Sequence, residues 1–388
     1  MPDSSALVIG ADLSAQPIAQ SLRLANRHGL VAGATGTGKT VTLQRLAEQF
    51  SDAGVAVFAA DIKGDLCGLG AAGNPQGKIA ERIAGMPWLN YQPKAYPVTL
   101  WDIQGKTGHP LRTTLSDMGP LLLGSLLELT DSQQSALYAA FKVADREGLL
   151  LLDLKDLKAL LNHLRDNPQV LGDDAALMTT GSSQALLRRL ATLEQQGAEA
   201  LFGEPALQLD DILQPASDGR GQIHLLDASR LVHEAPKVYA TFLLWLLAEL
   251  FEQLPERGDA DKPLLALFFD EAHLLFAGTP KALQDRLEQV VRLIRSKGVG
   301  VYFVTQSPAD LPDTVLAQLG LRIQHGLRAF TAKEQKSLKA VADGFRPNPA
   351  FSALAVLTEL GTGEALVGML EEKGTPAMVQ LVGGDFKG

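Results

Sequence analysis

One segment constrains the fold more than any other: a glycine-rich loop enclosed by an apolar run and an amphipathic helix. Residues 29–33 predict a short strand that ends in a glycine turn. A helix is predicted from about Lys39 to Phe50, with Leu43 and Leu46 on its apolar face. The intervening residues match the pattern G-x-x-x-x-G-K-[ST]: Gly33, Ala34, Thr35, Gly36, Thr37, Gly38, Lys39 and Thr40. A strand that leads through such a loop into a helix is typical of α/β proteins with a mostly parallel sheet.

The glycine-rich loop predicts a phosphate-binding site. Glycines let backbone N–H groups turn inward around phosphate oxygens, and the following helix adds the positive end of its dipole. Lys39 would reach the β and γ phosphates of ATP, and the Thr40 hydroxyl would bind Mg²⁺. We expect these residues to contact the nucleotide: Gly33, Ala34, Thr35, Gly36, Thr37, Gly38, Lys39, Thr40 and Val41. A chance glycine turn is one alternative, and a dinucleotide-binding G-x-G-x-x-G loop is another, but it requires glycine where Val41 stands.

A second motif ends an apolar run of the buried type. Residues 263–271 read PLLALFFDE, so Asp270 and Glu271 stand at the end of a predicted strand. Asp270 would hold the Mg²⁺ shell, and Glu271 would polarise the attacking water. The alternative is an ordinary strand end at which Asp270 caps the following turn. The adjacent Asp and Glu favour hydrolysis over phosphoryl transfer to a small molecule.

Two further polar residues end predicted strands. Asp61 follows the strand that begins at Val55 and opens the segment DIKGD, while Gln306 ends the segment VGVYFVTQ. Carboxyl ends of parallel strands meet at the ligand crevice, so Asp61 is placed to touch metal or water. Gln306 could sense the γ phosphate and relay its loss to the adjoining loop. A solvated turn at Asp61 and a simple polar strand end at Gln306 are the alternatives.

The chain alternates predicted strands and helices, which indicates an α/β fold with a mostly parallel sheet. Further strands are expected at 222–226, 264–270, 300–305, 321–327 and 365–370. Between about 110 and 218 the pattern becomes leucine-rich and helical, with few convincing strands. We therefore expect residues 1–109 and 219–388 to form one core, which residues 110–218 interrupt as a helical insertion.

Composition excludes several classes of protein. Lys and Arg number 35 against 44 Asp and Glu, so the net charge of −9 excludes a protein that coats DNA through bulk positive charge. A single cysteine, Cys67, excludes a disulfide framework, and the seven histidines show no ligand spacing. The longest apolar run, Phe242 to Ala248, is too short to cross a bilayer, and the N-terminus lacks the pattern of a signal peptide. We expect a soluble, cytoplasmic protein without a membrane partner.

Taken in order, the motifs resemble those of one protein family. GATGTGKT, DIKGD, FFDEAH and VTQ are similar to the motifs of the HerA/FtsK superfamily of RecA-like P-loop ATPases. Longer stretches such as YATFLLWLLAELFEQLP and GLRAFTAKEQKSLKAVADGFRPNPAF more closely resemble the bacterial YjgR-type HerA-like proteins. The resemblance covers about residues 5–375. It implies a RecA-like core with a helical insertion, hydrolysis of Mg·ATP and a hexameric ring that translocates duplex DNA, with a nuclease or another protein as a further partner.

The helix expected from about Lys281 to Lys297 carries two arginines of interest. Its predicted buried stripe consists of Leu283, Leu287, Val290, Val291 and Ile294. At 100° per residue Arg292 points away from that stripe, whereas Arg295 lies on its flank near the helix end. The resemblance implies that an arginine of this helix acts on the γ phosphate of a neighbouring subunit, and Arg295 aligns best. Alternatively, both arginines only complement the helix dipole ahead of Gly298.

These observations leave two functional hypotheses from different classes. The first is a Mg²⁺-dependent ATPase of the HerA-like class that works as a ring-shaped DNA translocase or helicase-like motor. The second is a nucleotide-gated scaffold that hydrolyses ATP slowly and regulates a protein partner. The resemblance favours the first hypothesis. The acidic charge balance favours the second, as does the absence of the β-barrel domain that HerA proteins carry before the loop, since only about 30 residues precede Gly33.

Overall fold

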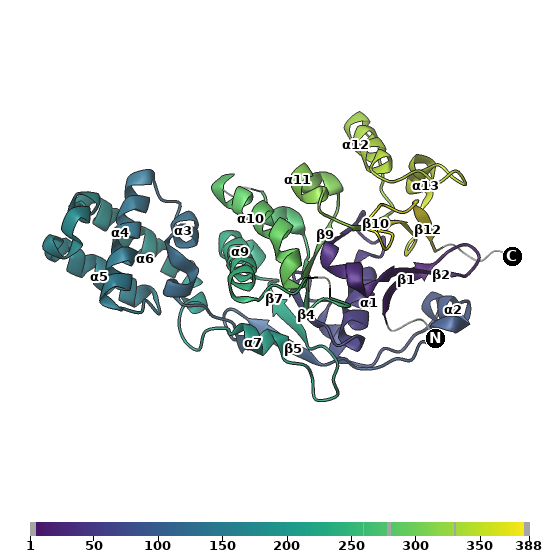
Figure 1. The fold of residues 1–388 in the computed structure, drawn as a ribbon, viewed down its shortest axis with the longest axis horizontal. Coiled ribbons are helices and arrows are strands. Elements are labelled where there is room, and N and C mark those ends of the chain that lie inside the picture. The colour runs from purple at the N-terminus through teal and green to yellow at the C-terminus, as the bar shows by residue number, and fades with distance from the viewer. Residues whose placement is uncertain (1–4, 259, 278–280, 330, 384–388) are drawn as a thin grey trace.

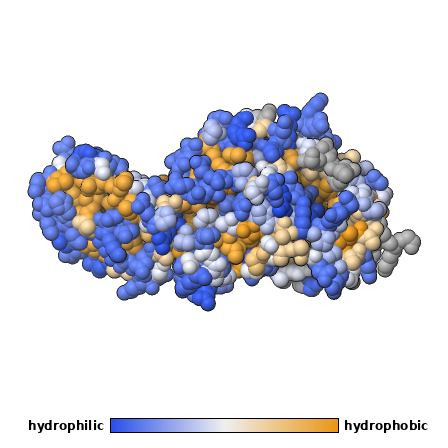
Figure 2. All heavy atoms as spheres, turned by 90° about the horizontal axis from the view of Figure 1, so that it is seen from below, coloured by the Kyte–Doolittle hydropathy of each residue, from blue (hydrophilic) through white to orange (hydrophobic). Residues whose placement is uncertain are grey.

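The computed structural model of the chain describes residues 5–258, 260–277, 281–329 and 331–383. Figure 1 shows a sheet covered by helices on both faces and, at one end, a separate lobe of helices. A waist between the lobe and the sheet core is visible on the face drawn in Figure 2, where apolar side chains also gather on the lobe. No helix in the described ranges is both long and apolar enough to cross a membrane.

The described residues form a sheet of ten strands in the order β12-β11-β10-β3-β9-β8-β4-β7-β5-β6. From one edge to the other these are Gln380–Val382, Ala365–Gly368, Leu321–His325, Gly29–Ala32, Val299–Thr305, Leu265–Phe269, Ala56–Asp61, Ile223–Asp227, Val98–Asp102 and His109–Pro110. All neighbouring pairs from β10 to β6 are parallel, whereas β11 and β12 pair antiparallel at one edge. The predicted α/β fold with a mostly parallel sheet is confirmed.

The strands expected from apolar runs are present: most are shorter than predicted, whereas β7 is shifted by one residue and β9 begins one residue earlier. The strand expected over 321–327 stops at His325, and the carbonyl of the next residue, Gly326, accepts a hydrogen bond from the Ala34 amide of the glycine-rich loop (3.0 Å). The sequence analysis missed the hairpin of β1 (Ala6–Ala11) and β2 (Pro17–Ser21). It also missed β12 and β6, which form the two edges of the described sheet, and β5 next to β6; these strands lack a long apolar run.

Both faces of the sheet are covered. Helix α1 (Lys39–Asp52) and the β1–β2 hairpin pack on one face, and α9 (Pro236–Gln253) and α10 (Lys281–Ile294) pack on the other. Every residue of β8 and β9 is buried, which is why these strands are continuous apolar runs without alternation. Helix α10 ends at Ile294, three residues before the predicted end. A 3₁₀ turn, Arg295–Lys297, and the left-handed Gly298 (φ 78°) then turn the chain into β9.

The lobe consists of four helices, α3 (Leu115–Leu126), α4 (Asp131–Glu147), α5 (Leu154–Asp166) and α6 (Thr180–Gln195). Its two connections meet at a neck, where the Thr113 amide donates to Leu201 O (2.8 Å) and the Gly203 amide to Thr113 O (3.0 Å). Helix α7 (Leu209–Leu213) lies back on the core, since His224 of β7 contacts the Ile212 carbonyl. The division of the chain at 110 and 218 remains a prediction, and the described lobe helices span a narrower range.

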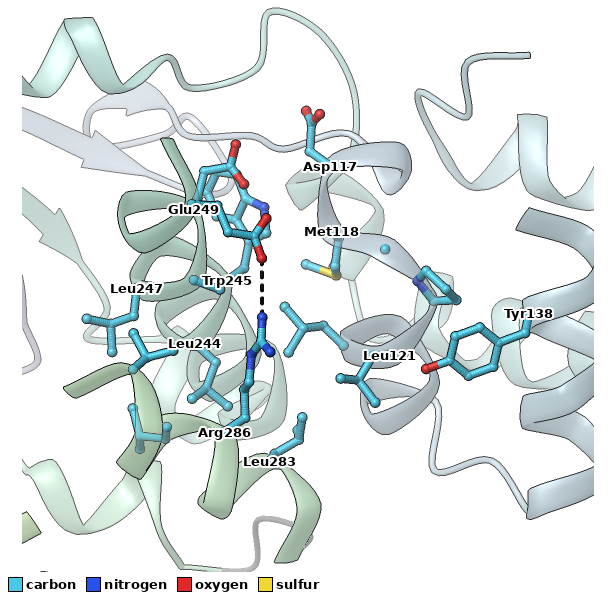
Figure 3. A pocket seen from close by; sticks show the side chains of 17 residues that line it. Asp117, Met118, Leu121, Tyr138, Leu244, Trp245, Leu247, Glu249, Leu283 and Arg286 are labelled. Atoms are coloured by element: carbon cyan, nitrogen blue, oxygen red, sulfur yellow. Dashed lines mark hydrogen bonds and ion pairs between the residues drawn. The ribbon is translucent and has the colours of Figure 1, made fainter. Parts of the chain in front are cut away.

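Apolar side chains of the lobe approach the core around a cavity of about 270 Å³ (Figure 3). Leu121 and Tyr138 line it from α3 and α4, and Leu244 and Trp245 line it from α9.

Five short helices complete the described fold: α2 (Lys78–Ala84), α8 (Leu231–Glu234), α11 (Asp313–Leu316), α12 (Ala332–Asp343) and α13 (Ala353–Glu359).

Three histidines are buried in the core and bonded as neutral rings. His28 Nδ1 accepts from the Val301 amide (3.0 Å), and His224 Nδ1 accepts from Trp101 Nε1 (3.0 Å). Burial lowers the pKa of His28, His224 and His325 to about 4. Their folded forms therefore stay uncharged at a pH at which the unfolded chain takes up protons.

We predict that the free energy of unfolding falls as the pH is lowered from 7 to 5. Each of the three histidines protonates near pH 6.5 when unfolded but only near pH 4 when folded, so stability present above pH 6.5 is lost below it. Each contributes about 2 kcal/mol over this interval. Urea unfolding followed by circular dichroism measures the effect. Between pH 7 and 8.5 these histidines contribute only a small slope, and equal midpoints at pH 7 and 5 would contradict the prediction.

Candidate active site

The parallel strands bring the predicted polar residues to one edge of the sheet. The glycine-rich loop follows β3, Asp61 ends β4, Asp270 follows β8 and Gln306 follows β9. These strands are neighbours in the order β3-β9-β8-β4, so their carboxyl ends lie side by side. Segments far apart in the sequence thus form one candidate site.

Glycine is required in the loop by close packing. Gly33 (φ 153°) lies against the strand end of β10, where an added Cβ would stand 2.6 Å from His325 Cβ. Gly38 (φ 115°) begins α1, and an added Cβ there would stand 3.1 Å from Gly363 Cα. The loop is anchored by hydrogen bonds from the Gly33 amide to Thr305 O (3.3 Å) and from the Gly363 amide to Thr37 O (2.8 Å). Neighbouring strands therefore hold it in place.

Lys39 is folded back onto the loop from the first turn of α1. Its Nζ donates to the carbonyls of Gly33 (2.6 Å) and Ala34 (3.0 Å), and the residue is 7% exposed. Burial and the nearby charge of Lys63 lower the pKa of Lys39, while Glu271 and Asp270 oppose this shift. An anion between the loop amides would give this ammonium a stronger partner than two neutral carbonyls.

Asp270 and Glu271 leave β8 in a tight turn. Glu271 has a left-handed backbone (φ 45°), and its amide donates to Asp270 Oδ1 (2.9 Å). Burial raises the pKa of Asp270, against the lowering effect of Lys63. Glu271 Oε1 lies 3.3 Å from Lys63 Nζ, and Oε2, 3.5 Å from His273 Nδ1, is buried without a hydrogen-bond partner among the described residues.

Lys63 is a charged member of the site that the sequence analysis missed. Burial lowers its pKa, but the carboxylates of Asp270 and Glu271 outweigh burial, so the pKa of Lys63 lies above its ordinary value. The signal in the sequence was the DIKGD segment at a strand end, which was considered only for its first carboxylate. Lys63 pairs directly with the carboxylate predicted to polarise water.

The Asp61 carboxylate accepts hydrogen bonds from amides of its own loop. Its Oδ1 accepts from the Gly64 amide (2.7 Å) and its Oδ2 from the Leu66 amide (3.0 Å), so it closes a turn, but the side chain is buried and the turn is not the solvated one of the alternative. Burial raises the pKa of Asp61, while these amides lower it. Asp61 thus shapes the loop that presents Lys63, and its direct role in catalysis remains a prediction.

Gln306 and Arg295 lie at opposite ends of the strand β9. Gln306 is exposed at the carboxyl edge, next to the hydrogen bond from Thr305 Oγ1 to Asp310 (2.6 Å). Arg295 is exposed at the amino edge, just before β9. The seven residues of β9 separate the two by about 20 Å, so Arg295 does not reach the site of its own subunit.

The residues at the site fit Mg²⁺ chemically. Thr40 and Asp270 supply hydroxyl and carboxylate oxygens, the hard ligands that Mg²⁺ prefers together with water and phosphate. A divalent cation would also stabilise the partly buried Asp270 carboxylate, whose pKa is raised by desolvation. His325 stands behind the loop: Nε2 contacts Thr42 Oγ1 (2.9 Å) and Nδ1 contacts Glu364 O (2.9 Å). It is a structural support that histidine spacing could not reveal.

The geometry agrees with a comparison against protein families. The family model described as Helicase HerA-like C-terminal matches residues 6–383. This chain belongs to that family. The predicted membership of the HerA/FtsK group is thereby confirmed.

Individual relatives are more distant. A probable helicase of Methanocaldococcus jannaschii, MJECL08, is 32% identical over 142 residues, which cover 34% of this chain and a quarter (25%) of the relative. The bacterial conjugative coupling protein TrwB is similar in structure over 100% of this chain and 90% of its own, with a TM-score of 0.64 and 16% identity. A TrwB complex with ADP and Mg²⁺ gives a TM-score of 0.62. VirB4 of Thermoanaerobacter pseudethanolicus matches with a TM-score of 0.61 and 15% identity over 98% of this chain and 96% of its own. The structural matches show the fold.

We predict that Lys39→Ala removes ATP turnover, on the order of 10³-fold, because no other side chain of the loop supplies positive charge to the phosphates. The fold should persist, since Lys39 contacts the loop backbone and is not part of a hydrophobic cluster. Steady-state turnover and far-ultraviolet circular dichroism measure the two effects. Lys142→Ala, at an exposed ion pair of the lobe, is the control. Turnover near that of the unmodified protein would refute the loop assignment.

Proposed function

We propose that this protein is a Mg²⁺-dependent ATPase of the HerA-like class and acts as a hexameric, ring-forming DNA translocase or helicase-like motor. One observation carries the proposal: the glycine-rich loop after β3 and the acids Asp270 and Glu271 after β8 lie at the carboxyl ends of strands that only β9 separates. A phosphate cradle and a hydrolytic carboxylate thus share one site. A cytoplasmic location and a nuclease or other protein partner belong to the same proposal.

Each residue of the site has a separate role in the proposed hydrolysis. Loop amides and Lys39 hold the β and γ phosphates. Glu271 Oε2, which has no hydrogen-bond partner in the described part of the chain, accepts a proton from the attacking water. Thr40 and Asp270 would hold Mg²⁺, which would supply positive charge to the phosphate oxygens when bound. Gln306, the polar residue at the carboxyl end of β9, senses the loss of the γ phosphate.

A nucleotide-gated scaffold with slow hydrolysis is the second candidate. It is favoured by the ion pair between Lys63 and Glu271, which occupies the proposed catalytic carboxylate, and by the net charge of −9. The MJECL08 protein, named a probable helicase, supports the motor instead.

The rate of ATP hydrolysis with and without long duplex DNA at fixed salt separates the two candidates. We expect DNA to stimulate a motor severalfold, because translocation couples turnover to the strand. Glu271→Gln is the background control: it should bind ATP but not hydrolyse it. Unchanged turnover across DNA concentrations would favour the scaffold, and normal hydrolysis by Glu271→Gln would place the catalytic carboxylate elsewhere, with Asp61 the first candidate.

Arg295 is proposed to serve the site of a neighbouring subunit. It lines a cavity of about 330 Å³ at the amino edge of the sheet with Arg27, Arg322 and Arg346. Arg322 donates to the Leu316 carbonyl (2.9 Å) and Arg346 to Glu371 (3.2 Å). The guanidinium of Arg295 makes no such bond to the described residues, which leaves it available to a phosphate that another subunit presents.

We predict that Arg295→Ala lowers turnover on the order of 10³-fold and that mixing restores part of it. In mixtures with Glu271→Gln, some sites combine an intact Glu271 with a donated Arg295, so activity should exceed that of either variant alone. Turnover across mixing ratios measures the recovery. Arg292→Ala, at an exposed position on the same helix, is the matched control. Full, concentration-independent turnover of Arg295→Ala would exclude this arginine.

A further inference from the structure

The cavity between the helical lobe and the core has no role in the chemistry described above (Figure 3). Its volume of about 270 Å³ is close to the lower limit of known ligand pockets and leaves room for one small organic molecule. Helices α3 and α4 of the lobe line one side, and α9 and α10 of the core line the other. A molecule in this cavity would contact both parts of the chain at once.

The lobe side of the cavity includes a break in α3. Gly119 leaves the helical conformation (φ 73°), and Pro120, which has no amide hydrogen, follows it. Both residues line the cavity, and a Cβ added at Gly119 would meet no atom of the described chain within 4 Å other than those of its immediate surroundings. The break thus places a residue without a side chain at the cavity wall.

Most of the lining is apolar. On the core side, Leu244, Leu283 and Leu287 are at most 5% exposed. On the lobe side, Leu121 and Tyr138 are 42% and 44% exposed, so the lobe does not cover them. These surfaces suit the apolar body of a ligand, and the face of the Tyr138 ring can in addition attract a cation.

A buried hydrogen-bond donor also belongs to the lining. Trp245 is 2% exposed, and its Nε1 has no hydrogen-bond partner among the residues that the structure describes. An indole N–H that is buried without an acceptor is costly, and such groups usually have a partner. A ligand oxygen with a free lone pair would supply one.

Acidic side chains outnumber basic ones in the described lining. Asp117, Glu249 and Glu252 carry carboxylates, whereas Arg286 is the one basic residue there and pairs with Glu252 (3.2 Å). Burial raises the pKa of Glu249, a hydrogen bond from Gln253 lowers it, and the charges of Asp117 and Glu252 raise it further. A cation in the cavity would favour the charged form of Glu249.

The donor and this acid stand in a fixed relation to each other. Trp245 and Glu249 are four residues apart in α9, so they lie on the same face of the helix with their Cβ atoms about 6 Å apart. Figure 3 shows both side chains on the side of α9 that faces α3. One small molecule can therefore reach the two groups together.

We propose that this cavity binds a small organic amine with an apolar or aromatic body, one ammonium group and one oxygen acceptor. The body packs on the leucines of α9 and α10, the oxygen accepts from Trp245 Nε1, and the ammonium lies beside Glu249. The bound amine joins the lobe to the core. This site is separate from the phosphate loop, so the inference goes beyond the proposed ATPase activity.

Calorimetric titration of the full chain with 3-methoxyphenethylamine tests the proposal. The neutral analogue 2-(3-methoxyphenyl)ethanol should bind about tenfold more weakly, because it lacks the charge that Glu249 attracts. Glu249→Gln should weaken binding of the amine about tenfold and leave binding of the alcohol unchanged. Glu147→Gln, at an exposed acid of the lobe, is the matched control and should change neither affinity.

A second pair of ligands tests the tryptophan. Trp245→Phe keeps an aromatic ring but removes the N–H donor, so it should weaken binding of 3-methoxyphenethylamine about fivefold. The same change should leave the affinity for 3-ethylphenethylamine unaltered, because a methylene replaces the oxygen in that amine. Circular dichroism of each variant without ligand checks that it is folded, and Glu249→Gln carries the test alone if Trp245→Phe is not.

Several results would overturn the proposal. The amine site does not exist if the unmodified protein fails to bind 3-methoxyphenethylamine or binds the amine and the alcohol equally. Unchanged amine affinity in Glu249→Gln would place the ammonium elsewhere, and an equal loss of both amines in Trp245→Phe would remove the hydrogen bond to Nε1. Because no titration contains a nucleotide, the proposed ATPase activity is tested separately.

Discussion

The parallel pairing of β3 with its neighbours is the constraint on which the site depends. β9 and β10 flank β3 in parallel register, with Ala32 opposite Thr305 and Gln324. Their carboxyl ends fix the loop through Thr305 O and Gly326 O, and the buried β8 places Asp270 at the same edge. Because β3, β9 and β8 are held by the core on both faces, the loop inherits its geometry from packing.

Charge balance is the second constraint, and it acts before any ligand binds. Lys39 is bonded to loop carbonyls and Lys63 to Glu271, so the two cations and the two acids of the site compensate one another. A triphosphate adds negative charge where Lys39 and Lys63 already stand. Binding must therefore exchange internal contacts for contacts with phosphate, and only the difference contributes to affinity. Glu271 pairs with Lys63 through Oε1, so Oε2, which has no hydrogen-bond partner among the described residues, can accept a proton while that pair persists.

Much of the fold could be predicted from the sequence because its central strands are buried on both faces and read as apolar runs. The loop and the pair Asp270–Glu271 could be located because each follows such a run. The contact of Lys63 with Glu271 could not, since it depends on a turn that the Asp61 carboxylate closes. The β1–β2 hairpin and the strands β5, β6 and β12 escaped notice because they are short and at most partly buried.

The helical lobe contacts α9 and α10, the helices that lie between the proposed hydrolytic site and Arg295. Helix α10 runs from the region after Glu271 to the turn that carries Arg295, and α9 lies beside it. α3 and α4 meet these helices around Trp245 and the ion pair of Arg286 with Glu252 (3.2 Å; Figure 3). In α3, Gly119 breaks the helical backbone (φ 73°) at this contact.

Trp245 Nε1 is buried without a hydrogen-bond partner among the described residues, so the contact is held by apolar packing and peripheral charge. Packing of this kind can be rearranged at lower cost than a satisfied hydrogen-bond network, because no buried polar pair has to be broken. A shift of the lobe would therefore displace α9 and α10 first, and through α10 it would displace Arg295.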